Sequence, residues 1–325
     1  MIVTSINNCK EYAWIEGVLY TIDVNNGFCI DDDLVLKGNY SIRGVTNNSI
    51  WLFDQLNFET LVYSKQDLIL KIAEYGLILK HSLGNDRYIV GLNSGNKILK
   101  GIYNLKTLRL ERKFEKLGFN GIYLMVDNEF FVSINKQNIA LFNLENDLKW
   151  QHSFSELIQS ENAFLHSRIL SSNDKLFFVI DGGENRGLFC IDSNTGKALH
   201  KYDKLWYELF QDQNLIYTTM FENTLCKINT ESFEVEEWNV NDLIKENGFE
   251  SMHDHRCVAH DNMFYFTQSL GDNKAKLGVL DWEKKELVYK HDFEPKNGAI
   301  GSIQVSKMRM FVHTQDNTLH IFEKE

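Results

Sequence analysis

The stretch LFCIDSNTGKALH (residues 188–200) decides the fold of this 325-residue chain. An apolar run ends in Asp192, a short polar turn follows, and a second extended run begins, which is the pattern of a β-hairpin. The phrase LYTIDVNNGFCI (residues 19–30) repeats this pattern near the start of the sequence. Two copies of one hairpin so far apart indicate an internally repeated chain.

Related phrases recur along the sequence, and in each an Asp, Asn or Glu ends an apolar strand. These anchor residues are Asp54, Asn104, Asn143, Asp192, Asn229, Asp281 and Glu323. The five steps from Asn104 to Glu323 average about 44 residues. A second apolar phrase precedes most anchors, such as NDRYIVGL (85–92) and NDKLFFVI (173–180), so each unit contains about four strands.

A four-stranded unit of this length, repeated along one chain, predicts an all-β fold, the β-propeller. Dividing the chain length by the repeat favours seven blades, and eight is the alternative if the Asp23 phrase anchors a shortened blade. The last unit ends after its third strand. We expect the N-terminal MIVTSI (residues 1–6) to supply the missing outer strand and close the ring, so that residues 1–325 form a single domain.

Alternate units share more than a strand pattern. Residues 139–160 align without gaps onto residues 225–246, an offset of two units. Two segments that interrupt the strand rhythm, 153–164 and 239–249, follow equivalent fourth strands and are expected to form short helices between blades. They either pack on the blade ends or build a recognition face, since loops on a rigid scaffold commonly carry binding.

The phrase IDSNTGKALH (residues 191–200) resembles the repeat of the pyrroloquinoline-quinone-like (PQQ-like) propeller superfamily. This resemblance implies a propeller fold. The cofactor-binding members of that superfamily are quinoprotein dehydrogenases with a docking Trp, a secretion signal and a vicinal disulfide. This sequence has His200 after Leu199 where the repeat usually ends in Trp, no signal-like N-terminus and no adjacent cysteines. We therefore expect no cofactor.

The charge and the cysteines limit the function further. A formal net charge of −11 argues against nucleic-acid binding, which needs a basic surface. It suits a basic protein partner or simple solubility. The five cysteines form no CxxC pair and are expected to be reduced thiols, and no apolar run is long enough for a membrane span. The sequence thus predicts a cytoplasmic protein without a membrane partner.

The sequence contains no recognisable catalytic motif. The stretch SMHDHRCVAH (residues 251–260) offers His253, His255 and Cys257 on alternate positions, which is a possible zinc pattern. The internal alignment places Cys257 on Leu170 and His255 on Arg168, so the sister unit lacks these ligands, and we expect no metal. Carboxylates gathered from different blades remain compatible with a hydrolase.

These observations favour a non-catalytic propeller that binds a macromolecule, specifically a protein partner with a basic surface. Cytoplasmic propellers that this chain resembles include immunity proteins of bacterial toxin systems. The alternative is a propeller enzyme, a hydrolase or lyase, with acids or histidines gathered from several blades. The residues predicted to contact the partner are Trp206, Tyr207, Asp31, Asp32, Asp33, Glu234, Glu236, Glu237, His253 and His255.

Overall fold

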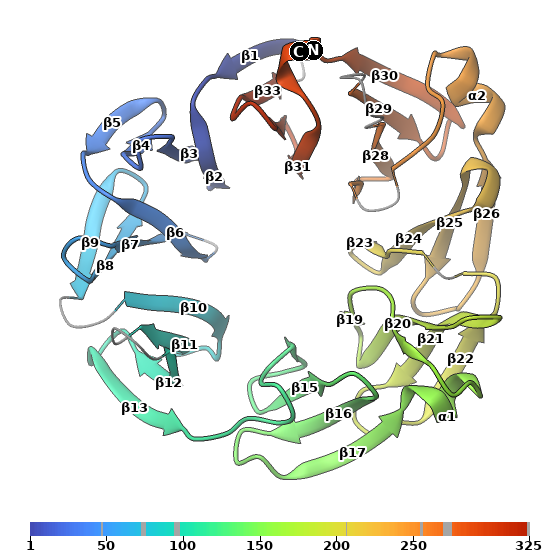
Figure 1. Ribbon diagram of the computed structural model, residues 1–325, viewed down its shortest axis with the longest axis horizontal. Coiled ribbons are helices and arrows are strands. Elements are labelled where there is room, and N and C mark those ends of the chain that lie inside the picture. Colours follow the sequence, from blue (N-terminus) through green and yellow to red (C-terminus); the bar gives the residue numbers. More distant parts are fainter. Residues whose placement is uncertain are drawn as a thin grey trace.

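A computed structural model describes residues 1–46, 48–72, 76–93, 98–205, 207–253, 256–268 and 275–323. These residues form eight antiparallel sheets arranged in a ring (Figure 1). Seven sheets have four strands, and the fifth has five because its innermost strand is split in two. The all-β propeller with four-stranded blades is therefore confirmed.

We number the sheets as blades 1 to 8 in chain order, each from its innermost to its outermost strand. Blade 1 consists of β2 (Cys9–Ile15), β3 (Val18–Asp23), β4 (Phe28–Ile30) and β5 (Asp33–Leu36), and blade 2 consists of β6 (Tyr40–Val45), β7 (Ile50–Asp54), β8 (Glu59–Ser64) and β9 (Asp67–Ile72). Blade 3 consists of β10 (Gly76–Ser82), β11 (Arg87–Asn93), β12 (Ile98–Asn104) and β13 (Arg109–Phe114), and blade 4 consists of β14 (Leu124–Met125), β15 (Phe130–Ile134), β16 (Asn138–Asn143) and β17 (Leu148–Ser153). Blade 5 consists of β18 (Phe164–Leu165), β19 (Leu170–Ser172), β20 (Lys175–Gly182), β21 (Asn185–Asp192) and β22 (Ala198–Tyr202), and blade 6 consists of β23 (Phe210–Asp212), β24 (Leu215–Met220), β25 (Thr224–Asn229) and β26 (Val235–Asn239). Blade 7 consists of β27 (Val258–His260), β28 (Met263–Gln268), β29 (Lys276–Asp281) and β30 (Glu286–Asp292), and blade 8 consists of β31 (Ile300–Val305), β32 (Arg309–Thr314), β33 (Leu319–Glu323) and β1 (Ile2–Ile6).

The preference for seven blades was wrong, and eight, the stated alternative, is correct. The anchor phrase marks a hairpin, not a fixed place in the blade: Asp54 ends the second strand of blade 2, whereas Asp192 ends the third strand of blade 5. Both carboxylates accept backbone N–H groups of the following turn, which is useful in any hairpin. Blade 1 is also compact and fits within residues 9–36, so division by the mean repeat undercounts the blades.

The expected closure by the N-terminal strand is confirmed. Strand β1 pairs antiparallel with β33, from Ile2 opposite Glu323 to Ile6 opposite Leu319. Ile2 and Val3 remain exposed, at 54% and 39%, while Ile6 packs against the core between the last and first blades. The closure therefore depends on backbone pairing and Ile6 more than on apolar packing along the whole strand.

Each pair of neighbouring blades shares its own hydrophobic core. Side chains alternate along a strand, so each sheet presents apolar residues to the blades on both sides, and the central strand β7 is buried along its whole length. The described residues form eight such clusters, one at every junction around the ring. The closing cluster of blades 8 and 1 has the fewest buried members.

The outer strand of one blade also contacts the turn between the third and fourth strands of the next. The indole Nε1 of Trp150 donates to the carbonyl of Ser193 at 2.8 Å. Its ring lies against Gly196, where φ is +72° and an added Cβ would meet the ring at 2.8 Å. The hydroxyl of Tyr202 donates to the carbonyl of Phe233 at 3.2 Å in the equivalent place one junction on. These polar contacts fix neighbouring blades at the outer edge of the ring.

The strand order gives the ring two faces. The first face carries the turns between first and second strands and between third and fourth strands. The second face carries the turns between second and third strands and the blade-to-blade connections. The expected short helices, α1 (Phe154–Ile158) and α2 (Asn241–Glu246), lie in second-face connections after blades 4 and 6. Ile158 and Ile244 are buried in junction cores, so both helices pack on blade ends.

Two short 3₁₀ helices, η1 (Phe221–Asn223) and η2 (Pro295–Asn297), complete the described elements. Among the described residues, no helix has the length and apolar character needed to cross a bilayer.

Candidate functional site

The inner rim of the first face is the most distinctive polar region of the ring. We define it as the turns that join the innermost strand of each blade to the second strand, together with Asp212 at the end of β23. It carries seven carboxylates from six blades, and its described turns include one lysine, Lys307 of blade 8. The carboxylates are Glu16, Asp86, Asp127, Glu129, Asp174, Asp212 and Asp261.

Turn geometry explains why several of these residues are Asp. In blades 5 and 7 the turn consists of two residues that both have positive φ, such as Asn173 (47°) and Asp174 (58°), and in blade 3 the last two residues of the turn, Asn85 and Asp86, also have positive φ. Such turns match the twist of the flanking strands, and Asn, Asp and Gly tolerate them best. Asn, Gly and Asp are equivalent in this role, so turn geometry alone does not explain the excess of negative charge.

Within the described part of the chain, no rim carboxylate pairs with a Lys or Arg. Among the described residues, the single ion-pair contact of a rim carboxylate is that of Asp261 with His260, at 3.6 Å between Nε2 and Oδ2. Some carboxylates elsewhere do have such partners: Glu208 pairs with Arg168 at 2.6 Å, and Glu145 pairs with Arg112 at 2.9 Å. The rim thus presents uncompensated negative charge around the centre of the ring.

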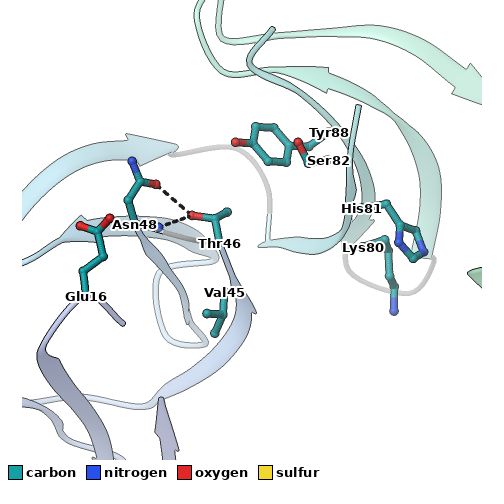
Figure 2. A pocket seen from close by; sticks show the side chains of 8 residues that line it. All are labelled: Glu16, Val45, Thr46, Asn48, Lys80, His81, Ser82 and Tyr88. Atoms are coloured by element: carbon teal, nitrogen blue, oxygen red, sulfur yellow. Dashed lines mark hydrogen bonds between the residues drawn. The ribbon is translucent and has the colours of Figure 1, made fainter. Parts of the chain in front are cut away.

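A cavity of about 480 Å³ lies on the same face, between blades 1, 2 and 3. Figure 2 shows the eight side chains that line it: Glu16, Val45, Thr46, Asn48, Lys80, His81, Ser82 and Tyr88. Thr46 is engaged locally, because its hydroxyl accepts the backbone N–H of Ser49 at 3.0 Å. The cavity therefore combines fixed turn residues with longer polar side chains from two other blades.

A β-bulge in strand β10 positions Lys80 and His81, which line one side of this cavity. In the pairing of β10 with β11, Leu79 lies opposite Val90 and His81 opposite Ile89, so Lys80 is the extra residue. A bulge changes the direction of nearby side chains and often occurs beside functional sites. Burial, assisted by the charge of Lys80, lowers the pKa of His81 below its ordinary value, so its imidazole is neutral near pH 7.

The predicted acidic contacts of blade 1 lie on the first face, outside the rim. Asp31 and Asp32 form the turn between the third and fourth strands, and Asp33 begins β5. Burial, together with the neighbouring Asp33 and Asp31, raises the pKa of Asp32. Glu234 occupies the corresponding turn of blade 6, so the structure does not bring it together with the blade 1 cluster.

Glu236 and Glu237 lie on β26, the outer strand of blade 6. Glu236 binds within the molecule: Lys227 pairs with it at 2.9 Å and the indole of Trp282 donates to it at 3.0 Å. The hydrogen bond from Lys227 has the largest effect in lowering the pKa of Glu236, and the hydrogen bond from Trp282 acts in the same direction. Glu236 therefore stabilises the junction of blades 6 and 7, whereas Glu237 is exposed.

The predicted aromatic and histidine contacts belong to second-face connections. Tyr207 lies half-buried between blades 5 and 6, and His253 lies between blades 6 and 7. Trp206 and His255 lie outside the described residues. The thiol of Cys257 donates to the carbonyl of His253 at 3.0 Å. Among the residues that the structure describes, no group of three His, Cys, Asp or Glu side chains is arranged to hold a metal.

Sequence reasoning missed the rim because most of its carboxylates are single turn residues on separate blades. The signal was nevertheless present in the second repeated phrase, where an acidic turn residue precedes each second strand in NDRYIVGL, DNEFFVSI, NDKLFFVI and DNMFYFTQ. Only the ring topology shows that these turns surround one axis (Figure 1).

Neither family models nor curated protein sequences match this chain. Solved structures of similar fold include BamB from Moraxella catarrhalis, with a TM-score of 0.58 and 10% identity over 99% of this chain and 100% of that chain. Sqt1 from Saccharomyces cerevisiae gives a TM-score of 0.60 and 10% identity over 99% and 98% of the two chains. The computationally designed Ika8 protein gives 0.53 and 11% identity over 98% and 96%. Likeness at this level of identity shows the propeller fold alone.

Proposed function

We propose that this protein is a non-catalytic binding module whose first face holds a protein partner with a basic surface. The observation that carries the proposal is the inner rim, where seven carboxylates from six blades surround the centre of the ring without a Lys or Arg partner among the described residues. A basic surface supplies the missing counter-charge and, with the chain at −11, is attracted before contact.

The scaffold suits this role because it holds the turns in place. Every junction between blades has its own buried core, and rim turns such as residues 173–174 lead into a second strand, here β20, that is buried on both sides. Turns held by such a scaffold lose little conformational freedom on binding, which favours affinity. Electrostatic attraction then contributes mainly to the association rate and to selectivity.

The test is to neutralise the rim without disturbing its turns. Asp86→Asn, Asp174→Asn and Asp261→Asn remove three charges at positions of positive φ that Asn also tolerates. The matched control removes three charges from exposed second-face residues through Glu161→Gln, Glu184→Gln and Glu246→Gln. Proteins captured by the wild-type chain are identified, and their association rates are measured by stopped flow at low and high salt.

We expect the rim variant to slow association about tenfold at low salt, and the control to slow it much less. The difference shrinks at physiological salt, where the Debye length is about 8 Å. Equal effects of the two triple variants, or a natural partner that is itself acidic, would refute the proposal.

Two finer proposals go with it. The partner is a bacterial toxin with a basic surface, and the protein neutralises it in the cytoplasm as an immunity protein. Co-expression tests this, because the wild-type chain should restore growth of cells that produce the captured partner and the rim variant should not.

The second finer proposal is that the fold belongs to the PQQ-like superfamily. Docking of Trp150 on the turn that contains Thr195 and Gly196 supports this, since a docking Trp is a feature of that repeat.

A further inference from the structure

We propose that the cavity between blades 1, 2 and 3 binds a small zwitterion, namely an amino acid or short peptide with a free ammonium group and a free carboxylate. The proposal goes beyond the proposed function and does not depend on it. It rests on the charges, the hydrogen-bonding groups and the backbone of the cavity itself.

The cavity has opposite charges on different blades. Glu16 comes from the first turn of blade 1 and Lys80 from the innermost strand of blade 3, and Figure 2 shows them on opposite sides of the lining group. Within the described residues, neither side chain has an ion pair or a hydrogen bond. A ligand that offers an ammonium group to Glu16 and a carboxylate to Lys80 satisfies both charges at once.

The remaining lining groups are neutral and suit the polar body of such a ligand. His81 is neutral near pH 7 because burial, with the charge of Lys80, lowers its pKa, so its ring offers one donor and one acceptor. The hydroxyl of Tyr88 has no hydrogen-bond partner among the described residues, while its ring lies 5.5 Å from that of buried Trp51. Val45, which is 48% exposed, provides apolar contact.

The backbone gives this lining its particular form. Lys80 is the extra residue of a bulge in the innermost strand, which interrupts the ladder between β10 and β11. The cavity measures about 480 Å³, within the range of about 300–1,000 Å³ that is usual for small-molecule sites. That size accepts an amino acid or a peptide of a few small residues and is too small for a folded domain.

Isothermal titration calorimetry on the full chain with alanine, dialanine and trialanine tests the proposal. We expect one member of the series to bind best, because its ammonium-to-carboxylate distance matches the cavity. N-acetylation or C-terminal amidation of that peptide should each weaken binding about tenfold. Absence of heat for all three peptides at millimolar concentration, or equal binding of free and capped peptides, would overturn the proposal.

Two variants assign the ends of the ligand. Glu16→Gln should remove the preference for the free over the acetylated peptide, and Lys80→Met should remove the preference for the free over the amidated peptide. Glu129→Gln, on the rim, and Lys106→Met, in an outer turn of blade 3, are matched controls that do not line the cavity. Unchanged preferences in both cavity variants would contradict the site. The rim triple variant should bind the peptide normally, so the two proposals fail separately.

Discussion

The junctions between blades and the inner rim of the first face use the same residue types in different ways. At the junction turns, Asp192 accepts the backbone N–H and hydroxyl of Thr195, and Asp281 accepts N–H groups of its own turn and pairs with Lys284 at 3.3 Å. On the rim, Asp174 and Asp261 also occupy hairpin turns but have no Lys or Arg partner among the described residues.

The pKa directions show what the junction contacts do. Hydrogen bonds from Thr195 hold the pKa of Asp192 below its ordinary value, and those from the backbone of Lys284 do the same for Asp281. Each such carboxylate stabilises the fold while it is ionised, and this contribution is lost as the pH falls below about 4. The junction acids therefore serve the fold. On the rim, Asp127 likewise accepts N–H groups of its own turn, whereas the Asp174 and Asp261 side chains have no such contact among the described residues.

The largest effect is expected at the junction of blades 4 and 5. Trp150→Ala removes a buried indole and its hydrogen bond to Ser193, so the free energy of unfolding should fall by about 3–5 kcal/mol. Urea denaturation measures the loss. Trp150→Phe keeps most of the packing and should cost about half as much. A loss under about 1 kcal/mol for the Ala variant would show that the junction cores alone hold the blades together.

The closing strand comes next. Deletion of residues 1–6 leaves β33 with an unpaired edge and removes Ile6 from the thinnest junction core, which should lower the free energy of unfolding by about 2–4 kcal/mol. Ile2→Ser and Val3→Ser are the controls and should change stability little, because both side chains are exposed. An unchanged melting temperature after the deletion would mean that the ring does not depend on this strand.

The comparison of the blade junctions with the inner rim also shows which features of the fold the sequence could predict. The hairpin pattern gave the fold, the four-stranded blades and the closure by residues 1–6, because alternation of apolar residues and turn chemistry are local. The blade number failed, since Asp54 and Asp192 stabilise turns at different places in their blades. Short-range signals do not distinguish one hairpin of a blade from the other.

The candidate site was harder to predict because it exists only in three dimensions. A run of acids such as Asp31–Asp33 is visible in the sequence, whereas Asp86 and Asp174 are isolated turn residues. Glu236 seemed available, yet Lys227 and Trp282 bind it. Which acids lack a counter-charge depends on neighbours from adjacent strands and blades, and no periodicity contains that information.

A smaller effect is expected from protonation at the closing junction. His320 is buried; its Nδ1 lies 3.2 Å from Ser5 Oγ and its Nε2 lies 3.2 Å from Thr314 Oγ1. Thr314 donates to Asp316, so its oxygen accepts from Nε2–H, and Nδ1 accepts from Ser5.

Burial lowers the pKa of His320 below 6.5; His291 and His313 act in the same direction, while Asp316 and Glu294 oppose it. The unfolded chain therefore takes up the proton first as the pH falls below about 6.5, and stability decreases there by at most about 1.4 kcal/mol for each pH unit. Comparing the melting temperatures of wild type and His320→Gln from about pH 7 to 5 isolates this residue. A stability difference between them that does not shrink toward low pH would show that His320 is not the group responsible.

The smallest effect, and the one of opposite sign, is expected on the rim. The triple variant Asp86→Asn, Asp174→Asn and Asp261→Asn relieves repulsion among like charges and keeps the positive-φ turns, so its free energy of unfolding should rise by at most about 0.5 kcal/mol. The gain should disappear at high salt, because screening already weakens the repulsion in the wild type. Denaturation at two salt concentrations measures this gain in stability. The control of equal charge is the second-face triple variant Glu161→Gln, Glu184→Gln and Glu246→Gln. A loss of about 1 kcal/mol or more would place the rim carboxylates among the groups that hold the fold, and the contrast with the junctions would then fail.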